Sequence, residues 1–500
     1  MGLIMLLRYK RNVLELVVFI GGASVMIFEL LGSRMIAPYF GTSLAVWTSL
    51  IGVVLASLSV GYSWGGKLAD RRADYKMLSA IVFMAGALIG LVAFVQTMIL
   101  MFLQQVTSDV RIGAVIGSIL LLAPPSVLLG MISPYAVKLK VNSLNTSGST
   151  VGNLYAISTI GSIVGTFGAG FFLIAYFGTA SLLFMLSLLL IITSLMIFPS
   201  SLSKSKVSLA VLLLASLWSG AYFKNPEILV DVDTLYNRAF IQEATHAATG
   251  RPMRILLTEP TEWQSAMFLD RDDDLVFEYT KYYRLADHFN PDIKKALLVG
   301  GGAYSYPKDF LAKHPQARLD VVEIDSRLTD IAREYFNLKD DPRMAIYHED
   351  GRTFLNKNNS QYDAIFMDAF KSFFSVPYQL TTKEAAELMY NSLSDDGVVL
   401  MNIISSIEGQ TGEFLRAEYA TYASVFPNVY ILPTSSPTDR LTVRNLMLVA
   451  LKSPRQVIWE SGDPELNRYL QNRWVRTIER DMPILTDDYA PVDQYIMKML

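Results

Sequence analysis

The pattern of hydrophobic residues divides the chain into two parts, one with long apolar stretches and one with short apolar runs between charged residues. Up to about residue 223 the sequence is a series of apolar stretches, each close to the length of about twenty residues that a helix needs to cross a membrane. Seven such stretches are predicted, at residues 13–37, 44–66, 77–103, 112–137, 149–176, 179–198 and 207–223. The pattern therefore predicts an N-terminal all-α transmembrane helix bundle over residues 1–223.

From residue 224 onward charged residues become frequent and the apolar runs shorten to strand length. Residues 224–293 alternate polar and apolar positions, as in "SAMFLD" (265–270), which predicts a small β-region. Residues 294–500 begin with strand patterns that alternate with helical ones up to about residue 452, which indicates a parallel, doubly wound sheet. The C-terminal part is thus predicted to be α/β and Rossmann-like, preceded by a β-rich segment.

Glycines crowd the fifth predicted span. The stretch "GSIVGTFGAG" places them at positions 161, 165, 168 and 170, a spacing that lets helix backbones approach closely. Tight helix packing is the favoured interpretation, and a transport path is the alternative.

Composition narrows the classes of function. A hydrophobic content of 52% and a mean hydropathy of +0.32 are too high for a wholly soluble chain of 500 residues, so a lipid bilayer is an expected partner. The net charge of −3 does not favour nucleic acid as a partner. The chain has no cysteine, and its four histidines lack metal-ligand spacing, so no catalytic metal is expected. The sequence is compatible with a homo-oligomer without specifying one.

A run of glycines marks the first candidate binding element. "KKALLVGGG" reads as a buried strand that ends in Gly300, Gly301 and Gly302, where the backbone can approach a ligand closely. "RLDVVEID" (318–325) reads as the next strand and carries Glu323, about twenty residues beyond the glycines, where a carboxylate can accept both hydroxyls of a ribose. A plain tight turn and a solvated strand-end charge are the structural alternatives.

Two further acidic positions follow predicted strands. Asp350 and Gly351 come after a third strand, within reach of a base such as adenine, and Asp368 ends a fourth strand, "YDAIFMDAF". Asp350 could instead cap the helix that follows it, and Asp368 could position a loop. In this order, the four elements predict an adenine nucleoside site.

This order of motifs resembles the spermidine synthases, the aminopropyltransferase branch of the class I S-adenosylmethionine-dependent fold. The resemblance extends over most of residues 230–450 and includes "EWQSAMFLD" (262–270), which implies a substrate-contacting role for Gln264. The helical part, "GNLYAISTIGSIVGT" (152–166) and "LTDDYAPVD" (485–493) resemble the membrane-fused branch, in which a major-facilitator-like module is joined to a spermidine synthase domain.

The sequence departs from the soluble spermidine synthases at three places. Their glycine turn continues into an Asp where this chain has Ala303, and a second Asp of the fourth-strand motif is replaced by Lys371. Their Tyr-x-Glu segment is altered to "LVFEYTKYY" (275–283), in which Tyr279 is the candidate substrate contact and Lys281 is added. Loss of acids and gain of lysines would weaken binding of a diamine and favour a substrate that carries a carboxylate. Lys371 is therefore a candidate substrate-binding residue, with a solvated loop position as its alternative.

Three functions remain open at this point. The first is transfer of an aminopropyl or aminocarboxypropyl group from decarboxylated or intact S-adenosylmethionine to an amine or amino acid, with Asp368 as the base and methylthioadenosine as the product. The second is methyl transfer from S-adenosylmethionine on the same fold. The third is a non-catalytic module that binds a nucleoside or a polyamine and is coupled to a transport-like membrane part.

The basic residues of the connections predict the orientation in the membrane. With the N-terminus in the cytoplasm, the inner side collects Arg8, Lys10, Arg11, Lys67, Arg71, Arg72, Lys76, Lys138, Lys140, Lys204 and Lys206. Only Arg34 and Arg111 then fall outside, so the positive-inside rule is satisfied. Seven spans place the C-terminal domain outside the cytoplasm, whereas supply of S-adenosylmethionine argues for the cytoplasm.

The charge count makes a direct prediction. Alkaline phosphatase fused after residue 230 should be active, and green fluorescent protein fused at the same place should be dark, because seven spans carry that position across the membrane. The reverse pattern would show that residues 207–223 do not span.

Overall fold

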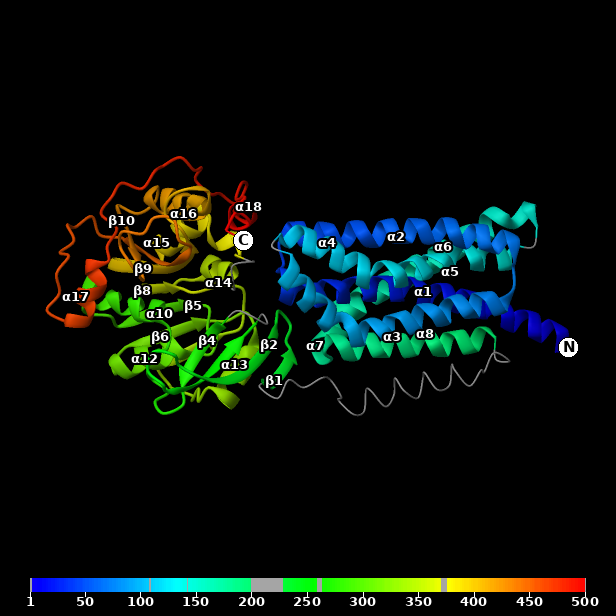
Figure 1. Ribbon diagram of the computed structural model, residues 1–500, viewed down its shortest axis with the longest axis horizontal. Coiled ribbons are helices and arrows are strands. Elements are labelled where there is room, and N and C mark those ends of the chain that lie inside the picture. Colours follow the sequence, from blue (N-terminus) through cyan, green and yellow to red (C-terminus); the bar gives the residue numbers. More distant parts are fainter. Residues whose placement is uncertain are drawn as a thin grey trace. The chain divides into compact units, whose positions relative to one another are not determined.

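The computed structural model describes residues 2–107, 109–141, 143–198, 228–258, 263–369 and 376–499 (Figure 1). The chain forms two compact units, Met1–Asn225 and Pro226–Leu500. The predicted span at 207–223 lies outside the described residues.

The described part of the first unit is helical. Its main helices are α1 (Gly2–Phe40), α2 (Leu44–Arg71), α3 (Tyr75–Val106), α4 (Val110–Leu121), α5 (Ala123–Lys140), α6 (Ser147–Gly168) and α8 (Thr179–Ile197). A π-helical turn, η2 (Ala169–Leu173), and the short α7 (Ile174–Tyr176) continue α6. Among the described residues five helices are long and apolar enough to cross a membrane, and a sixth span results if α4 and α5 count together.

The α4–α5 pair is bent by 51°. Pro124 and Pro125 stand in the first turn of α5, where they have no backbone N–H to continue the hydrogen bonding of α4. The predicted span at 112–137 therefore corresponds to two helices rather than one.

Glycines set the contact between α1 and α6. A Cβ atom at Gly161 would lie 2.1 Å from the carbonyl oxygen of Phe19, and one at Gly165 would lie 2.6 Å from that of Ala23. Gly168 and Gly170 have no such neighbour within 4 Å. Close packing of the two backbones accounts for the first two glycines of the motif and not for the last two.

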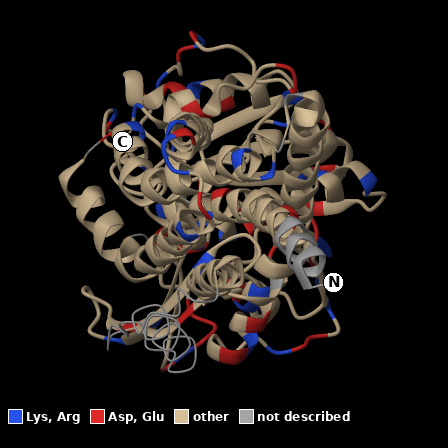
Figure 2. Ribbon diagram, turned by 90° about the vertical axis from the view of Figure 1, so that its right-hand side faces the viewer, with Lys and Arg blue, Asp and Glu red and all other residues tan. Residues whose placement is uncertain are grey.

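Charged side chains form ion pairs near the last turns of α2 and α5, and Figure 2 colours the charged positions along the ribbon. The pairs join α2 and its following turn, α5 and α1: Asp70 with Lys138 at 2.6 Å, Arg72 with Asp74 at 2.7 Å, and Glu15 with Lys140. These residues belong to the side that the charge count assigns to the cytoplasm.

The second unit begins with a small antiparallel sheet. Its strands are β1 (Ile228–Asp233), β2 (Arg238–Thr245), β3 (Pro252–Leu257) and β4 (Trp263–Phe268), in that order. Short helical segments follow, namely α10 (Glu278–Tyr282), η4 (Tyr283–Leu285) and α11 (Ala286–Phe289).

A larger sheet has the strand order β10-β11-β9-β8-β5-β6-β7. Its strands are β5 (Lys295–Val299), β6 (Arg318–Val322), β7 (Met344–Tyr347), β8 (Tyr362–Met367), β9 (Leu393–Ser405), β10 (Asn428–Pro433) and β11 (Arg444–Leu451). The pairs among β5 to β9 are parallel, which confirms the predicted α/β fold. The expectation of a parallel sheet up to residue 452 is wrong at its end, where β11 runs antiparallel to both neighbours. The short connection between β10 and β11 leaves no room for a crossover helix.

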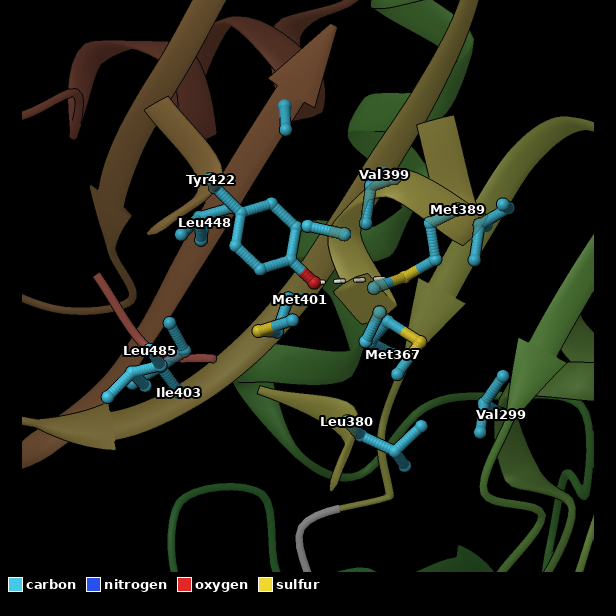
Figure 3. Close-up of a cluster of buried hydrophobic side chains, with 14 of the residues drawn as sticks. Val299, Met367, Leu380, Met389, Val399, Met401, Ile403, Tyr422, Leu448 and Leu485 are labelled. Carbon is cyan, nitrogen blue, oxygen red and sulfur yellow. Dashed lines mark hydrogen bonds between the residues drawn. The ribbon is translucent and has the colours of Figure 1, made fainter. Parts of the chain in front are cut away.

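Helices cover both faces of this sheet (Figure 1). They are α12 (Ser305–Lys313), α13 (Ser326–Tyr335), α14 (Gly351–Lys357), α15 (Lys383–Asn391), α16 (Glu413–Ala423), α17 (Pro464–Gln471) and α18 (Val492–Ile496), with the 3₁₀ turns η5 (Tyr378–Leu380) and η6 (Gln410–Gly412). One apolar core includes residues from α14, α15, α16 and α18, and another includes residues from α11, α12 and α17. Figure 3 shows part of the first core, where the Tyr422 hydroxyl lies 3.7 Å from the sulfur of Met389.

The α1–α6 contact can be tested with a single methyl group. We expect Gly161→Ala to lower the thermal stability of the full-length protein in lipid nanodiscs, by an overpacking cost of about 1–3 kcal/mol. Gly152→Ala is the matched control because a Cβ atom there would have no atom of a neighbouring helix within 4 Å. Equal melting temperatures for the two variants would contradict this account of the helix contact.

Candidate functional site

The site lies where the order of strands reverses. From β5 the chain continues to β6 and β7 on one side, and then returns to place β8 on the other side of β5. Ligands of open α/β sheets bind at the carboxyl ends of the strands at such a point. A cavity of about 220 Å³ opens there.

The structure brings nearly all of the predicted site residues to this cavity. Its lining includes Gln264, Tyr279, Gly300, Gly301, Gly302, Glu323, Asp350, Gly351 and Asp368. Lys371 lies outside the described residues. The common cleft that the order of motifs requires is therefore present.

The glycine turn is shaped by its approach to β8. Gly300 has a φ of +102°, and a Cβ atom there would lie 2.3 Å from the carbonyl oxygen of Asp368. Gly302 has a φ of +53°, which also lies in the left-handed region. Only glycine at position 300 lets the end of β5 pass this close to the end of β8.

Glu323 holds the turn in place. Its side chain is 6% exposed, and one carboxylate oxygen accepts hydrogen bonds from the N–H groups of Gly301, at 2.9 Å, and Gly302, at 3.1 Å. The other oxygen accepts from the N–H of Asp325 at 2.9 Å. Burial raises the pKa of Glu323, and the three amide hydrogen bonds offset part of that effect. A carboxylate has about four lone-pair sites, so one acceptor position remains after these bonds.

Asp350 is both a helix cap and part of the cavity wall. Its carboxylate accepts from the N–H of Thr353 at 3.0 Å, which caps α14, and its second oxygen lies 3.4 Å from the side-chain nitrogen of Gln379. The capping role considered from the sequence is thus present, together with a position on the cavity. Gly351 packs against β5, because a Cβ atom there would lie 2.7 Å from a methyl group of Val299.

Asp368 stands at the end of β8 among neutral donors. Burial raises the pKa of its carboxyl to about 6, and hydrogen bonds from Tyr283, Tyr279 and Asn402 offset part of that rise. The Tyr279 hydroxyl lies 3.3 Å from a carboxylate oxygen. Burial raises the pKa of both tyrosines well above the ordinary value, so both keep their protons. The Tyr283 hydroxyl donates to the backbone carbonyl of Met367 at 3.2 Å, directly before Asp368.

Sequence reasoning missed several residues of this site. Tyr283 and Asn402 help to offset the raised pKa of Asp368 although they lie far from it in the sequence, and Asn237 and Gln379 line the cavity from turns. Asn402 carried a usable signal, because it is a lone amide in the apolar run "VVLMNIIS". Tyr283 carried none that separates it from the neighbouring tyrosines.

Ala303 and Lys281 are positions at which this sequence departs from the soluble spermidine synthases. Both lie away from the cavity wall. Ala303 is fully buried in an apolar cluster with Ala239 and Ile241. Lys281 forms an ion pair with Glu278 at 3.0 Å, and neither residue is among those that line the cavity. These two substitutions therefore do not place a new charge in the cavity.

Comparison with known proteins agrees with this geometry. The Spermine/spermidine synthase domain matches residues 282–452, which lie within the second unit. A probable polyamine aminopropyl transferase of Bifidobacterium longum is 32% identical over 228 residues, which are 42% of this chain and 49% of that protein. The polyamine aminopropyltransferase of Vibrio vulnificus is 25% identical over 238 residues, 45% of this chain and 77% of the relative. The chain thus spans about half the length of the first relative and about three quarters of the second.

Among solved structures, a probable spermidine synthase from Corynebacterium glutamicum is similar to this chain. The TM-score is 0.44 at 21% sequence identity, and the match covers 52% of this chain and 97% of that one.

The raised pKa of Asp368 makes a prediction about stability. An acid whose pKa is about 6 when folded and near 3.8 when unfolded costs stability above pH 6, and this cost disappears as the pH falls toward 4. We expect Asp368→Asn to raise the melting temperature of the C-terminal unit at pH 8 more than at pH 5. If the melting temperatures of Asp368→Asn and the wild type differ by the same amount at pH 5 and pH 8, the carboxyl of Asp368 has an ordinary pKa.

Proposed function

We propose that the C-terminal unit is an aminopropyltransferase that moves the aminopropyl group of decarboxylated S-adenosylmethionine to an amine and releases methylthioadenosine. The observation that carries the proposal is the convergence of the glycine turn, Glu323, Asp350 and Asp368 on one cavity at the strand switch point. The match to the Spermine/spermidine synthase domain supports the same reaction class.

The nucleoside is assigned to the β5–β7 side of the cavity. The remaining acceptor position of Glu323 is available to one ribose hydroxyl, and Gly301 and Gly302 let the ligand approach the backbone. Asp350 and Gly351 form the wall proposed to contact the adenine, with Gln379 beside them.

The amine acceptor is assigned to the side of Asp368. Tyr279 reaches Asp368 from α10, and Gln264 lines the same cavity from β4. The side-chain oxygen of Gln264 is buried and has no hydrogen-bond partner in the described part of the chain, so it is available as an acceptor for an amine N–H.

The reaction is an in-line displacement. The lone pair of a neutral amine attacks the methylene carbon next to the sulfonium, a C–N bond forms, and the C–S bond breaks with its electron pair remaining on sulfur. Positive charge thereby moves from sulfur to nitrogen, and the nitrogen gives up a proton. Asp368 is the group proposed to stabilise this charge and accept the proton, because its pKa of about 6 leaves it ionised at neutral pH while making it a stronger base than an ordinary Asp.

We further propose that this enzyme is attached to a membrane by the helices of the first unit. The support is the length and apolar character of five described helices, or six spans with the bent α4–α5 pair.

Two variants separate binding from chemistry in the full-length protein. We expect Asp368→Asn to lower kcat by a factor of about 10²–10⁴, the contribution of a positioned base, while the Kd for methylthioadenosine changes little. Glu323→Gln should instead weaken methylthioadenosine binding, because it replaces a buried carboxylate that holds the glycine turn. Calorimetry and product chromatography measure the two effects, and normal turnover in both variants would show that the site is misplaced.

The products discriminate between the other reactions. Methylthioadenosine formed from the decarboxylated substrate supports the proposal, and methylthioadenosine formed only from intact S-adenosylmethionine would indicate aminocarboxypropyl transfer. S-adenosylhomocysteine would indicate methyl transfer. Binding of methylthioadenosine without any of these products would indicate a non-catalytic module.

A further inference from the structure

The segment 485–489, here called the C-terminal strap, is attached to the helices beside the cavity. Leu485 is fully buried in the core drawn in Figure 3. Its N–H donates to the Thr421 hydroxyl at 2.9 Å, and its carbonyl accepts from the N–H of Lys383 at 2.8 Å. The strap therefore has a defined position against α15 and α16, although it lies more than a hundred residues after the residues that line the cavity.

Asp487 of the strap binds the first turn of α14. Its two carboxylate oxygens accept from the two terminal nitrogens of Arg352, at 3.0 and 2.6 Å, in a bidentate arrangement. One of these oxygens also accepts from the hydroxyl of Thr382, the residue that caps α15, at 2.7 Å. One side chain thus joins the beginnings of two helices.

Arg352 connects Asp487 to residues that line the cavity. It directly follows Asp350 and Gly351, and it donates to the carbonyl of Gln379 at 2.9 Å. Gln379 and Leu380 form part of η5 and line the cavity next to Gly351, where an added Cβ would lie 3.4 Å from Leu380. Asp487 is therefore separated from the proposed adenine wall by a single side chain.

We infer that Asp487 is a positioning residue for the nucleoside site, acting through Arg352 to hold η5 at a fixed separation from Asp350 and Gly351. The inference rests on the proposed function, because it assigns the nucleoside base to this wall. Ordering a wall before the ligand binds lowers the conformational entropy that binding must remove. The contact between Asp487 and Arg352, called the clamp below, therefore strengthens nucleoside affinity. It does not touch Asp368, so the chemical step is left unchanged.

A second ion pair in the same part of the chain provides a matched control. Asp481 accepts from Arg416 at 2.7 and 3.0 Å and attaches the preceding segment to α16. The exposed fractions are alike, at 6% and 46% for Arg416 and Asp481 and at 14% and 48% for Arg352 and Asp487. Neither Asp481 nor Arg416 lines the cavity.

The experiment compares Asp487→Asn, Asp487→Glu, Asp481→Asn and Asp488→Asn in the full-length protein in nanodiscs. Asp487→Asn should raise the Kd for methylthioadenosine and the KM for the nucleoside substrate roughly three- to tenfold, with kcat within about twofold of the wild type, as expected for a residue coupled to a ligand through one neighbour. Asp487→Glu keeps the carboxylate and should recover part of the affinity. Asp481→Asn should lower the melting temperature without changing the Kd, and the exposed Asp488→Asn should change neither.

An unchanged Kd in Asp487→Asn, an equal change in Asp481→Asn, or a loss confined to kcat would each overturn the inference. Failure of the wild-type protein to bind methylthioadenosine would instead remove the proposed function, and with it the basis of the inference. Calorimetry on the wild type therefore distinguishes failure of the function from failure of the clamp.

Discussion

The close crossing of two strand ends is the constraint on which the site depends. Gly300 passes so near the carbonyl of Asp368 that a single added carbon would lie 2.3 Å from it, so β5 and β8 can meet in this way only with glycine at that position. Glu323 then ties the next two amides of the turn to β6. Three adjacent strands are thereby held together at their carboxyl ends, and this holds the glycine turn, Glu323 and Asp368 around one cavity.

Bringing several carboxyl groups to one cavity removes part of their hydration, and different donors compensate each group. Backbone amides stabilise Glu323, a helix N-terminus stabilises Asp350, and hydroxyl and amide side chains stabilise Asp368. The donors identified around Asp368 are all neutral, so burial outweighs them and its pKa stays raised. An arginine partner would instead have lowered the pKa of Asp368 and made it a poorer base.

Short sequence motifs predicted more of the structure than could be predicted about contacts between residues that are distant in the sequence. Strand ends carrying Gly301, Glu323, Asp350 and Asp368 were identifiable because each motif is contained in a few consecutive residues. The antiparallel course of β11 was missed because an apolar run has the same appearance in a parallel and an antiparallel strand. Tyr283 and Asn402 were missed because their role depends on contact with a residue that is distant in the sequence.

The sequence by itself determined the division into an apolar helical part and an α/β part, and the order of the nucleoside-site motifs, because periodicity and short motifs are local properties of the chain. Only the tertiary structure decided which donors surround Asp368, that Gly161 and Gly165 rather than Gly168 meet α1, and that Asp487 reaches Arg352. Such contacts depend on the distance between segments after folding. Sequence separation carries no information about that distance, because it is set by the packing of the whole unit.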